Sequence, residues 1–155
     1  RPPRSTLFPY TTLFRSAQRG NPCAGLCQTS TRRTMNVEDI RAYCLSLPLV
    51  TEDFPFDEDC LAFRVQGKIF AMINLENTKW FVLKCNPDYA VELREQHREI
   101  EGAWHMNKRY WNQLDIYGEL SDELIKALIR HSYAEVVSKF SGKMKRENPV
   151  LLTVR

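Results

Sequence analysis

The sequence predicts a two-layer α+β domain, in which an antiparallel sheet of about five strands is covered by three helices. Two observations predict this class. Short segments in the middle of the chain alternate apolar and polar residues, which is typical of half-buried strands. Segments before, between and after them repeat apolar residues at helical spacing, and the last of these is long enough to cover a sheet. The expected order is α-β-β-β-α-β-β-α.

A short helix and three strands are expected first. Apolar residues repeat at helical spacing between residues 40 and 47, and Pro48 ends this helix because proline cannot continue it. The pair Gln66-Gly67 turns the chain between the first two strands, and a polar loop at residues 76–79 precedes the third. The strands are expected at residues 61–65, 68–75 and 80–85.

A second helix, two strands and a long final helix follow. Asn86 and Pro87 form a strong helix start, an N-cap followed by proline at the first helical position, and this helix runs to about Gln96. Ser121 caps the final helix, whose apolar stripe continues to Phe140. The two strands between these helices are expected at residues 103–107 and 111–117.

The two ends of the chain are expected to lie outside the folded domain. Residues 1–16 resemble one reading frame of a common sequencing adapter translated into protein, and the rest of residues 1–34 is polar and expected to lack a packed structure. Met35 is then the natural start of a domain that spans residues 35–147. Residues 148–155 are expected to form a flexible C-terminal tail.

The net charge changes when residues 1–34 are set aside. The whole chain has 22 Lys and Arg against 19 Asp and Glu, a formal charge of +3. Seven of the basic residues lie in residues 1–34 or at Arg155, whereas all the acidic residues lie between Glu38 and Glu147. The domain therefore keeps 15 basic and 19 acidic residues, a net charge of −4. Because DNA binders usually neutralise phosphates with a basic surface, this charge argues against strong nucleic-acid binding.

The most specific pattern in the chain runs from Lys84 to Trp111 and reads K-C-N-P-D-Y-A-V-E-L-R-E-Q-H-R-E-I-E-G-A-W-H-M-N-K-R-Y-W. It resembles the signature of the MmcQ/YjbR family of small bacterial proteins. The match continues upstream with Y-C-L-S-L-P and E-D-F-P-F, and downstream with G-E-L-S-D-E-L-I-K-A-L-I-R-H-S-Y. The resemblance covers residues 35–147 and implies a YjbR-like fold of the same α+β architecture. It also implies DNA binding as the expected function.

Wing-like hairpin loops are a further feature that the resemblance implies, here at residues 66–68 and 76–79. A wing contacts phosphate through one or two lysines, and Lys68 and Lys79 meet that demand. In the alternative interpretation, these lysines only keep the turns soluble.

The turn at residues 105–111 concentrates hydrogen-bond donors and aromatic side chains. Arg and Lys can hold phosphates, while Trp and Tyr can stack on an unpaired base for roughly 1–3 kcal/mol. In the alternative interpretation, Trp104 and Trp111 anchor the hairpin in the core and the cations are merely solvated. The expected nucleic-acid-binding residues are therefore Lys68, Lys79, His105, Asn107, Lys108 and Arg109.

No catalytic site, metal site or cofactor is expected. The three cysteines of the domain lie among apolar neighbours and are expected to be buried free thiols. Cys85 with His105, or Cys44 with His131, would supply a nucleophile and a base, but no motif fixes their geometry. The acidic run at residues 52–59 lacks the spacing of a calcium loop and is expected to be a solvated loop.

Two classes of function stay open at this point. The first is a small non-enzymatic cytoplasmic protein that binds DNA weakly through phosphate contacts on a local basic face. The second is a protein-interaction or adaptor module without nucleic-acid binding, which the net charge favours. No run of 18 apolar residues and no secretory signal are found, so we expect no membrane association and a cytoplasmic location.

Overall fold

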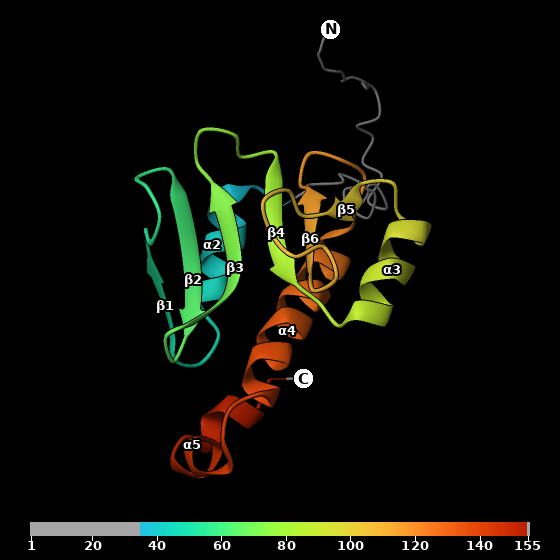
Figure 1. The fold of residues 1–155 in the computed structure, drawn as a ribbon. Helices are drawn as coiled ribbons and strands as arrows, with labels where there is room; N and C mark the ends of the chain where they lie inside the picture. Colours follow the sequence, from blue (N-terminus) through green and yellow to red (C-terminus); the bar gives the residue numbers. More distant parts are fainter. Residues whose placement is uncertain (1–34, 155) are drawn as a thin grey trace, which may run out of the picture. The chain divides into compact units, whose positions relative to one another are not determined.

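The computed structural model describes residues 35–154 of the protein (Figure 1). The expectations for residues 1–34 and Arg155 lie outside the described residues, including the resemblance of residues 1–16 to a sequencing adapter. The described residues form α2 (Val37–Leu45), β1 (Val50–Asp53), β2 (Cys60–Val65), β3 (Lys68–Asn74), β4 (Trp80–Lys84), α3 (Pro87–Gln96), β5 (Ile100–Gly102), β6 (Trp111–Asp115), α4 (Asp122–Ser138), α5 (Gly142–Glu147) and the 3-10 helix η3 (Pro149–Leu152).

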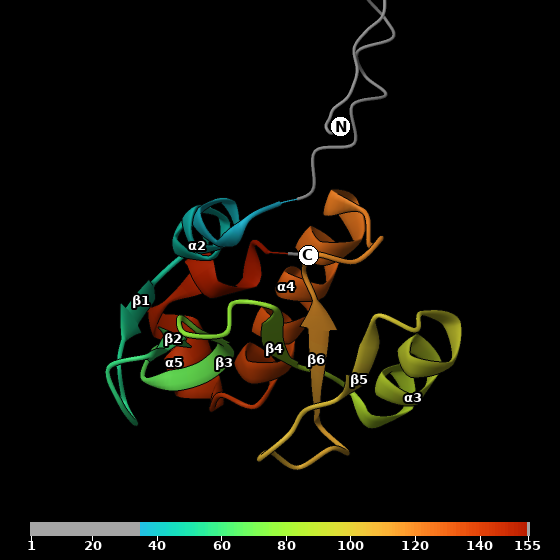
Figure 2. The same ribbon diagram turned by 90° about the horizontal axis from the view of Figure 1, so that it is seen from above.

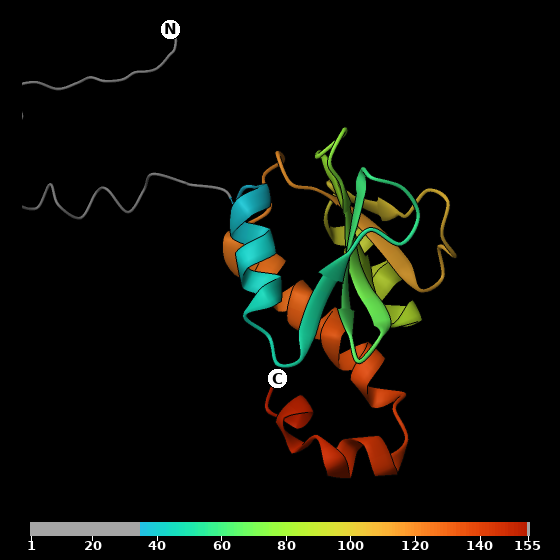
Figure 3. The same ribbon diagram turned by 90° about the vertical axis from the view of Figure 1, so that its left-hand side faces the viewer.

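The strands form one antiparallel sheet in the order β1-β2-β3-β4-β6-β5. Figure 3 shows α2 and α4 on one face of this sheet, and α4 packs across β2, β3 and β4. The helix α3 lies beside β5 at the edge of the sheet (Figure 2). Of the helices described, none packs across the opposite face of the central strands, which we call the open face of the sheet. The α+β class expected from the sequence is confirmed.

The long helix α4 supplies much of the core behind the sheet. Ser132 lies on its buried face, where the hydroxyl donates to the carbonyl of Phe70 and accepts from the backbone N–H of Lys84 at 2.9 Å. This hydroxyl is therefore satisfied, and it ties α4 to both β3 and β4. The apolar stripe expected on this helix is confirmed by the burial of Ile125, Leu128, Ile129, Tyr133, Val136 and Val137.

A β-bulge in β3 decides which side chains reach the open face. The register between β2 and β3 shifts after Phe63 and leaves Phe70 without an opposite residue. Phe70 and Ala71 both join the core, and the Phe70 ring lies edge-on to Tyr133 with 5.7 Å between the centroids. Alternation resumes from Ala71, so that Met72 points to the open face.

The last hairpin differs from the expectation. The strand expected at residues 103–107 is a loop, and β5 lies earlier, at Ile100–Gly102. His105 has a φ of 62°, in the left-handed region, which a continuous strand does not tolerate. Trp104 is 70 % exposed, so the interpretation that it anchors the hairpin in the core is wrong.

Two further segments differ from the expectation. The strand β1 is not predicted by the sequence, because V-T-E-D lacks apolar alternation, yet it pairs along its whole length with β2. The flexible tail expected from residue 148 contains η3, and Leu151 within it is 1 % exposed. Burial of this leucine joins the C-terminal segment to the core, so that expectation is wrong for residues 149–152.

Candidate binding cleft on the open sheet face

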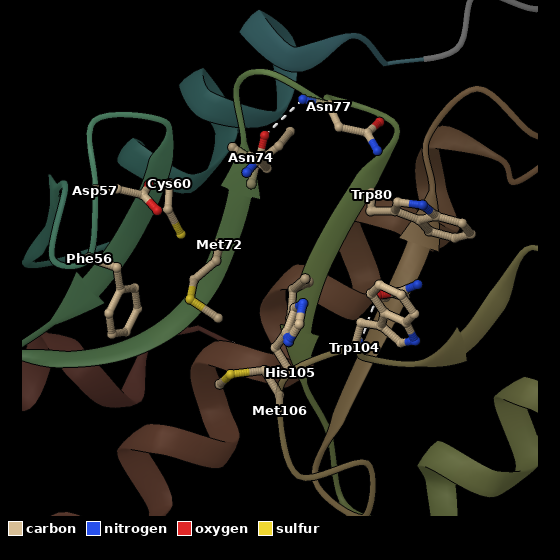
Figure 4. Close-up of a pocket in the computed structure, with 13 residues that line it drawn as sticks. Phe56, Asp57, Cys60, Met72, Asn74, Asn77, Trp80, Trp104, His105 and Met106 are labelled. Atoms are coloured by element: carbon tan, nitrogen blue, oxygen red, sulfur yellow. Dashed lines mark hydrogen bonds between the residues drawn. The ribbon is translucent and has the colours of Figure 1, made fainter.

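Side chains from four strands form the floor of a cleft on the open face of the sheet (Figure 4). Successive residues of a strand point to opposite faces, so the neighbours of core residues point into this cleft. Met72 follows the core residue Ala71, and Val82 lies between the core residues Phe81 and Leu83. The floor consists of Cys60, Met72, Val82 and Gln113.

Two loops form the walls of the cleft. The β1–β2 loop (residues 54–59) contributes Phe56 and Asp57, and the β5–β6 loop (residues 103–110) contributes Trp104 and the two residues after it. The cleft has a volume of about 490 Å³, within the range of pockets that bind small molecules or side chains. The rim is completed by Asn74, Asn77 and Trp80.

The aromatic side chains on the two walls are largely open to solvent. Phe56 is 67 % exposed and Trp104 is 70 % exposed, although large aromatic residues usually bury most of their surface. Figure 4 shows them on opposite sides of Met72. The backbone N–H of Trp104 donates to the side-chain oxygen of Gln113 at 3.0 Å, which fixes this wall to the floor. The ring of His105 lies 5.3 Å from that of Trp104.

The β1–β2 loop also gives its wall a negative charge. Phe56 is followed directly by Asp57, Glu58 and Asp59, and Asp57 lines the cleft. One carboxylate oxygen of Asp57 accepts the backbone N–H of Asp59 at 3.2 Å, a local turn that holds the loop. Within residues 35–154, none of these three carboxylates takes part in an ion pair. The wall therefore keeps its negative charge.

The residues expected to contact nucleic acid occupy three places in the fold. Lys68 begins β3, whereas Lys79 precedes β4 at the other end of β3. A strand of that length separates them by roughly 20 Å. Lys79 is also engaged, because its ammonium group lies 3.5 Å from Asp115 and 4.7 Å from the centre of the Trp80 ring. The other four residues lie on the β5–β6 loop.

Two of those four residues shape the β5–β6 loop itself. The side-chain oxygen of Asn107 accepts the N–H of Arg109 at 2.9 Å, and its carbonyl accepts the N–H of Tyr110 at 3.0 Å. The carbonyl of Lys108 accepts a hydrogen bond from Arg94 of α3. These contacts close the turn and leave the Lys108 and Arg109 side chains exposed.

Three cations gather where the β5–β6 loop meets the end of α4, and we call them the cationic cluster: Lys84, Arg109 and Lys139. The ammonium group of Lys84 lies 5.0 Å from the Trp111 ring and 5.8 Å from the Tyr110 ring, and Arg109 lies 5.7 Å from the same tyrosine. Burial, and then the charge of Lys139, lower the pKa of Lys84, although the nearby carboxylate of Glu135 acts in the opposite direction. Sequence reasoning missed Lys84 and Lys139, because only the tertiary fold brings a strand end beside a helix end.

The cysteines do not form a nucleophile–base pair with His105 or His131. Burial raises the pKa of Cys85 to about 11 and also raises the pKa of Cys44 and Cys60. All three are free thiols, and Cys60 is only half-buried. The Nε2 atom of His131 accepts the backbone N–H of Asn86 at 3.2 Å, and burial lowers the pKa of this ring. In the described part of the chain, neither of the Cys–His pairs considered above is hydrogen-bonded.

The acidic run at residues 52–59 does not converge on one point. Glu52 pairs with Arg41, and Asp53 pairs with Arg64 at 2.8 Å, so the first two carboxylates support β1. Across residues 35–154, no group of three or more His, Cys, Asp or Glu side chains is arranged to hold a metal ion. Over the same range, no helix combines the length and the apolar character that crossing a membrane requires.

The relatives that this chain matches in sequence are small proteins, most of whose length is covered by the match. The chain is 30% identical to the "Uncharacterized protein YjbR" of Escherichia coli K12 over 105 residues, which are 67% of this chain and 89% of that protein. It is 29% identical over 114 residues to the "Uncharacterized protein YbdF" of Escherichia coli O157:H7, which are 72% of this chain and 93% of that protein.

Solved structures give the same result. The crystal structure of Deinococcus radiodurans DR2400, a DUF419 domain, matches with a TM-score of 0.69 and 31% identity, over 74% of this chain and 88% of that one. A Pseudomonas syringae protein matches with a TM-score of 0.54 and 26% identity, over 63% of this chain and 96% of that one. The model of the YjbR family matches residues 45–135. The chain therefore belongs to the YjbR family.

Proposed function

We propose that this protein is a small binding module, which receives a segment of a protein partner in the cleft on the open sheet face. The observation that carries the proposal is the pair Phe56 and Trp104, exposed by 67 % and 70 % on the two walls. Exposed aromatic side chains around an apolar floor are typical of interfaces, because they offer a large contact area and lose little conformational entropy on binding.

The chemistry of the cleft favours binding over catalysis. Cys60 is the thiol that lines it, and burial together with the charge of Asp57 raises the pKa of that thiol. A protonated thiol is a poor nucleophile, so the role proposed is not enzymatic. The free thiols support a cytoplasmic location, since cysteines stay reduced there.

Peptide selection tests the proposed function. A phage-displayed library of random peptides would be selected on the full-length protein, and the affinity of each recovered peptide measured. We expect Trp104→Ala or Phe56→Ala to weaken binding about 30-fold, as removal of an interface anchor does. Both side chains are more than half exposed, so the folding midpoint should hardly change.

An exposed aromatic residue elsewhere supplies the matched control. Tyr117 is 62 % exposed and does not line the cleft. Tyr117→Ala should leave the affinity of the same peptides unchanged. If the recovered peptides bind the Phe56 and Trp104 variants as tightly as the wild type, the cleft is not a protein-binding site.

DNA binding is a second candidate function, and the cationic cluster is the observation that favours it. Lys84 and Arg109 lie against the Tyr110 ring, and the charge of Lys139 acts on Lys84, so the cluster offers charges for phosphates beside a ring for stacking. The domain carries a net charge of −4, so this binding would be weak and strongly dependent on salt.

Gel-shift titrations at several salt concentrations test this candidate. Changing Lys84, Arg109 and Lys139 together to Gln should flatten the slope of log K against log salt by about one unit per residue. Lys68→Gln with Lys79→Gln serves as the comparison and should change the slope less, because Lys79 is already paired with Asp115. A slope that is unchanged in the folded triple variant would remove the cationic cluster from any DNA site.

A further inference from the structure

We infer that the cleft receives a basic peptide. The peptide places an apolar side chain on the floor, a backbone carbonyl against the side-chain amide of Gln113, and Lys or Arg side chains against the carboxylates after Phe56. This inference rests on the proposed function, because it names the chemistry of the partner for the same cleft. Three features of the cleft carry it.

The first feature is a buried amide whose nitrogen has no acceptor. Gln113 is 7 % exposed and lines the floor. Its side-chain oxygen accepts the N–H of Trp104 at 3.0 Å, which fixes the orientation of the amide. Among the hydrogen bonds of residues 35–154, the Gln113 nitrogen donates none. Buried donors are rarely left without an acceptor, and a peptide carbonyl entering the cleft supplies one.

The second feature is the apolar floor around that amide. Met72 is 6 % exposed, and Val82 and Cys60 lie beside it without any charged residue among the floor side chains. Met106 adds a second thioether from the β5–β6 loop. Methionine side chains are flexible and polarisable, so they adapt to apolar side chains of different shape. The floor therefore selects an apolar residue in the peptide.

The third feature is the charge of the wall that carries Phe56. Asp57, Glu58 and Asp59 have no ion-pair partner within the described residues. Lys79, next to the rim residue Trp80, is already paired with a carboxylate on β6. Complementary charge steers an approaching partner and fixes its register, so this wall favours a cationic segment and repels phosphates.

The exposed aromatic rings strengthen the same preference. Trp104 and Phe56 present open faces on opposite sides of the floor (Figure 4). A guanidinium or ammonium group is attracted to such a face, and arginine also stacks on it. Carboxylates and aromatic faces at one cleft thus both select Lys or Arg next to the apolar residue.

Pairs of synthetic peptides test the charge preference. The tightest peptide from the selection would be compared with a copy in which every Lys and Arg is replaced by Gln. We expect the neutral copy to bind about 10-fold more weakly, the combined effect of several partly exposed charge pairs. The variant Asp57→Asn, Glu58→Gln, Asp59→Asn should distinguish the two peptides much less than the wild type does, because only the attraction of the aromatic faces then remains.

A second neutralised variant is the matched control. Glu92→Gln, Glu95→Gln and Glu123→Gln remove the same charge from exposed positions of α3 and α4 that do not line the cleft. This variant should distinguish the two peptides as the wild type does. Nuclear magnetic resonance of the wild type gives an independent measurement, in which the side-chain amide protons of Gln113 should move downfield as the basic peptide saturates the cleft.

The outcomes separate this inference from the function on which it rests. Peptides that depend on Phe56 and Trp104, but bind equally well without their Lys and Arg, would overturn the inference and leave the binding module in place. An unmoved Gln113 amide resonance at saturation would overturn the carbonyl contact. If no peptide depends on the two aromatic residues, the proposed function fails and the inference fails with it.

Discussion

At the scale of one residue, the surroundings of His131 determine whether its ring carries a proton. Its Nε2 atom accepts the backbone N–H of Asn86 at 3.2 Å, and the Tyr89 ring lies 5.0 Å from its own. Burial lowers the pKa of His131, although the nearby carboxylate of Glu135 acts in the opposite direction. Protonation would place a second donor against the Asn86 N–H, so the fold favours the neutral ring.

Protonation of His131 should therefore lower the free energy of unfolding as the pH falls. The folded pKa of His131 lies below the unfolded one, so its contribution is complete above about pH 6.5 and is lost as the pH falls through the folded pKa. His131→Gln keeps an acceptor but cannot titrate, and it should lose less unfolding free energy than the wild type between about pH 7 and pH 5. Urea unfolding at several pH values measures this difference. Parallel pH profiles for the two proteins would show that His131 does not contribute.

At the scale of helices and strands, the sequence predicts best where the signal is local. Asn86 and Pro87 predict a helix start, and α3 begins at Pro87 with the Asn86 side chain accepting the N–H of Asp88 at 3.0 Å. Ser121 caps α4 by accepting the N–H of Leu124 at 3.2 Å. Each of these bonds joins residues within one turn, so the neighbouring sequence is sufficient to predict it.

Features that depend on residues distant in the sequence cannot be predicted from the local sequence. The segment V-T-E-D is a strand only because β2 lies beside it. The bulge at Phe70 depends on the register with β2, and it decides that Met72 faces the cleft. Phe56 and Trp104 come from loops far apart in the sequence, so no local pattern joins them. The available signal was their context, because aromatic residues in an acidic run and in a polar turn are not explained by solvation.

The described domain as a whole separates its charges along the sheet. The acidic wall belongs to the cleft, which Trp80 lines at the start of β4. The cationic cluster includes Lys84, at the end of the same strand. The net charge of −4 therefore conceals two local fields of opposite sign. The proposed peptide site and the proposed phosphate site therefore lie in different parts of the domain, and we expect variants of one to leave the other intact.

The C-terminal segment is part of the folded unit at this scale, and two adjacent leucines test its role. Leu151 is 1 % exposed and belongs to the core, whereas Leu152 is 51 % exposed. Leu151→Ala should lower the free energy of unfolding by about 2–5 kcal/mol, because it removes buried methyl groups and leaves a cavity. Leu152→Ala, the same change one position later, should stay within about 0.5 kcal/mol of the wild type. Chemical denaturation measures both values. Equal stabilities for the two variants would mean that η3 does not support the core, and that the domain ends before it.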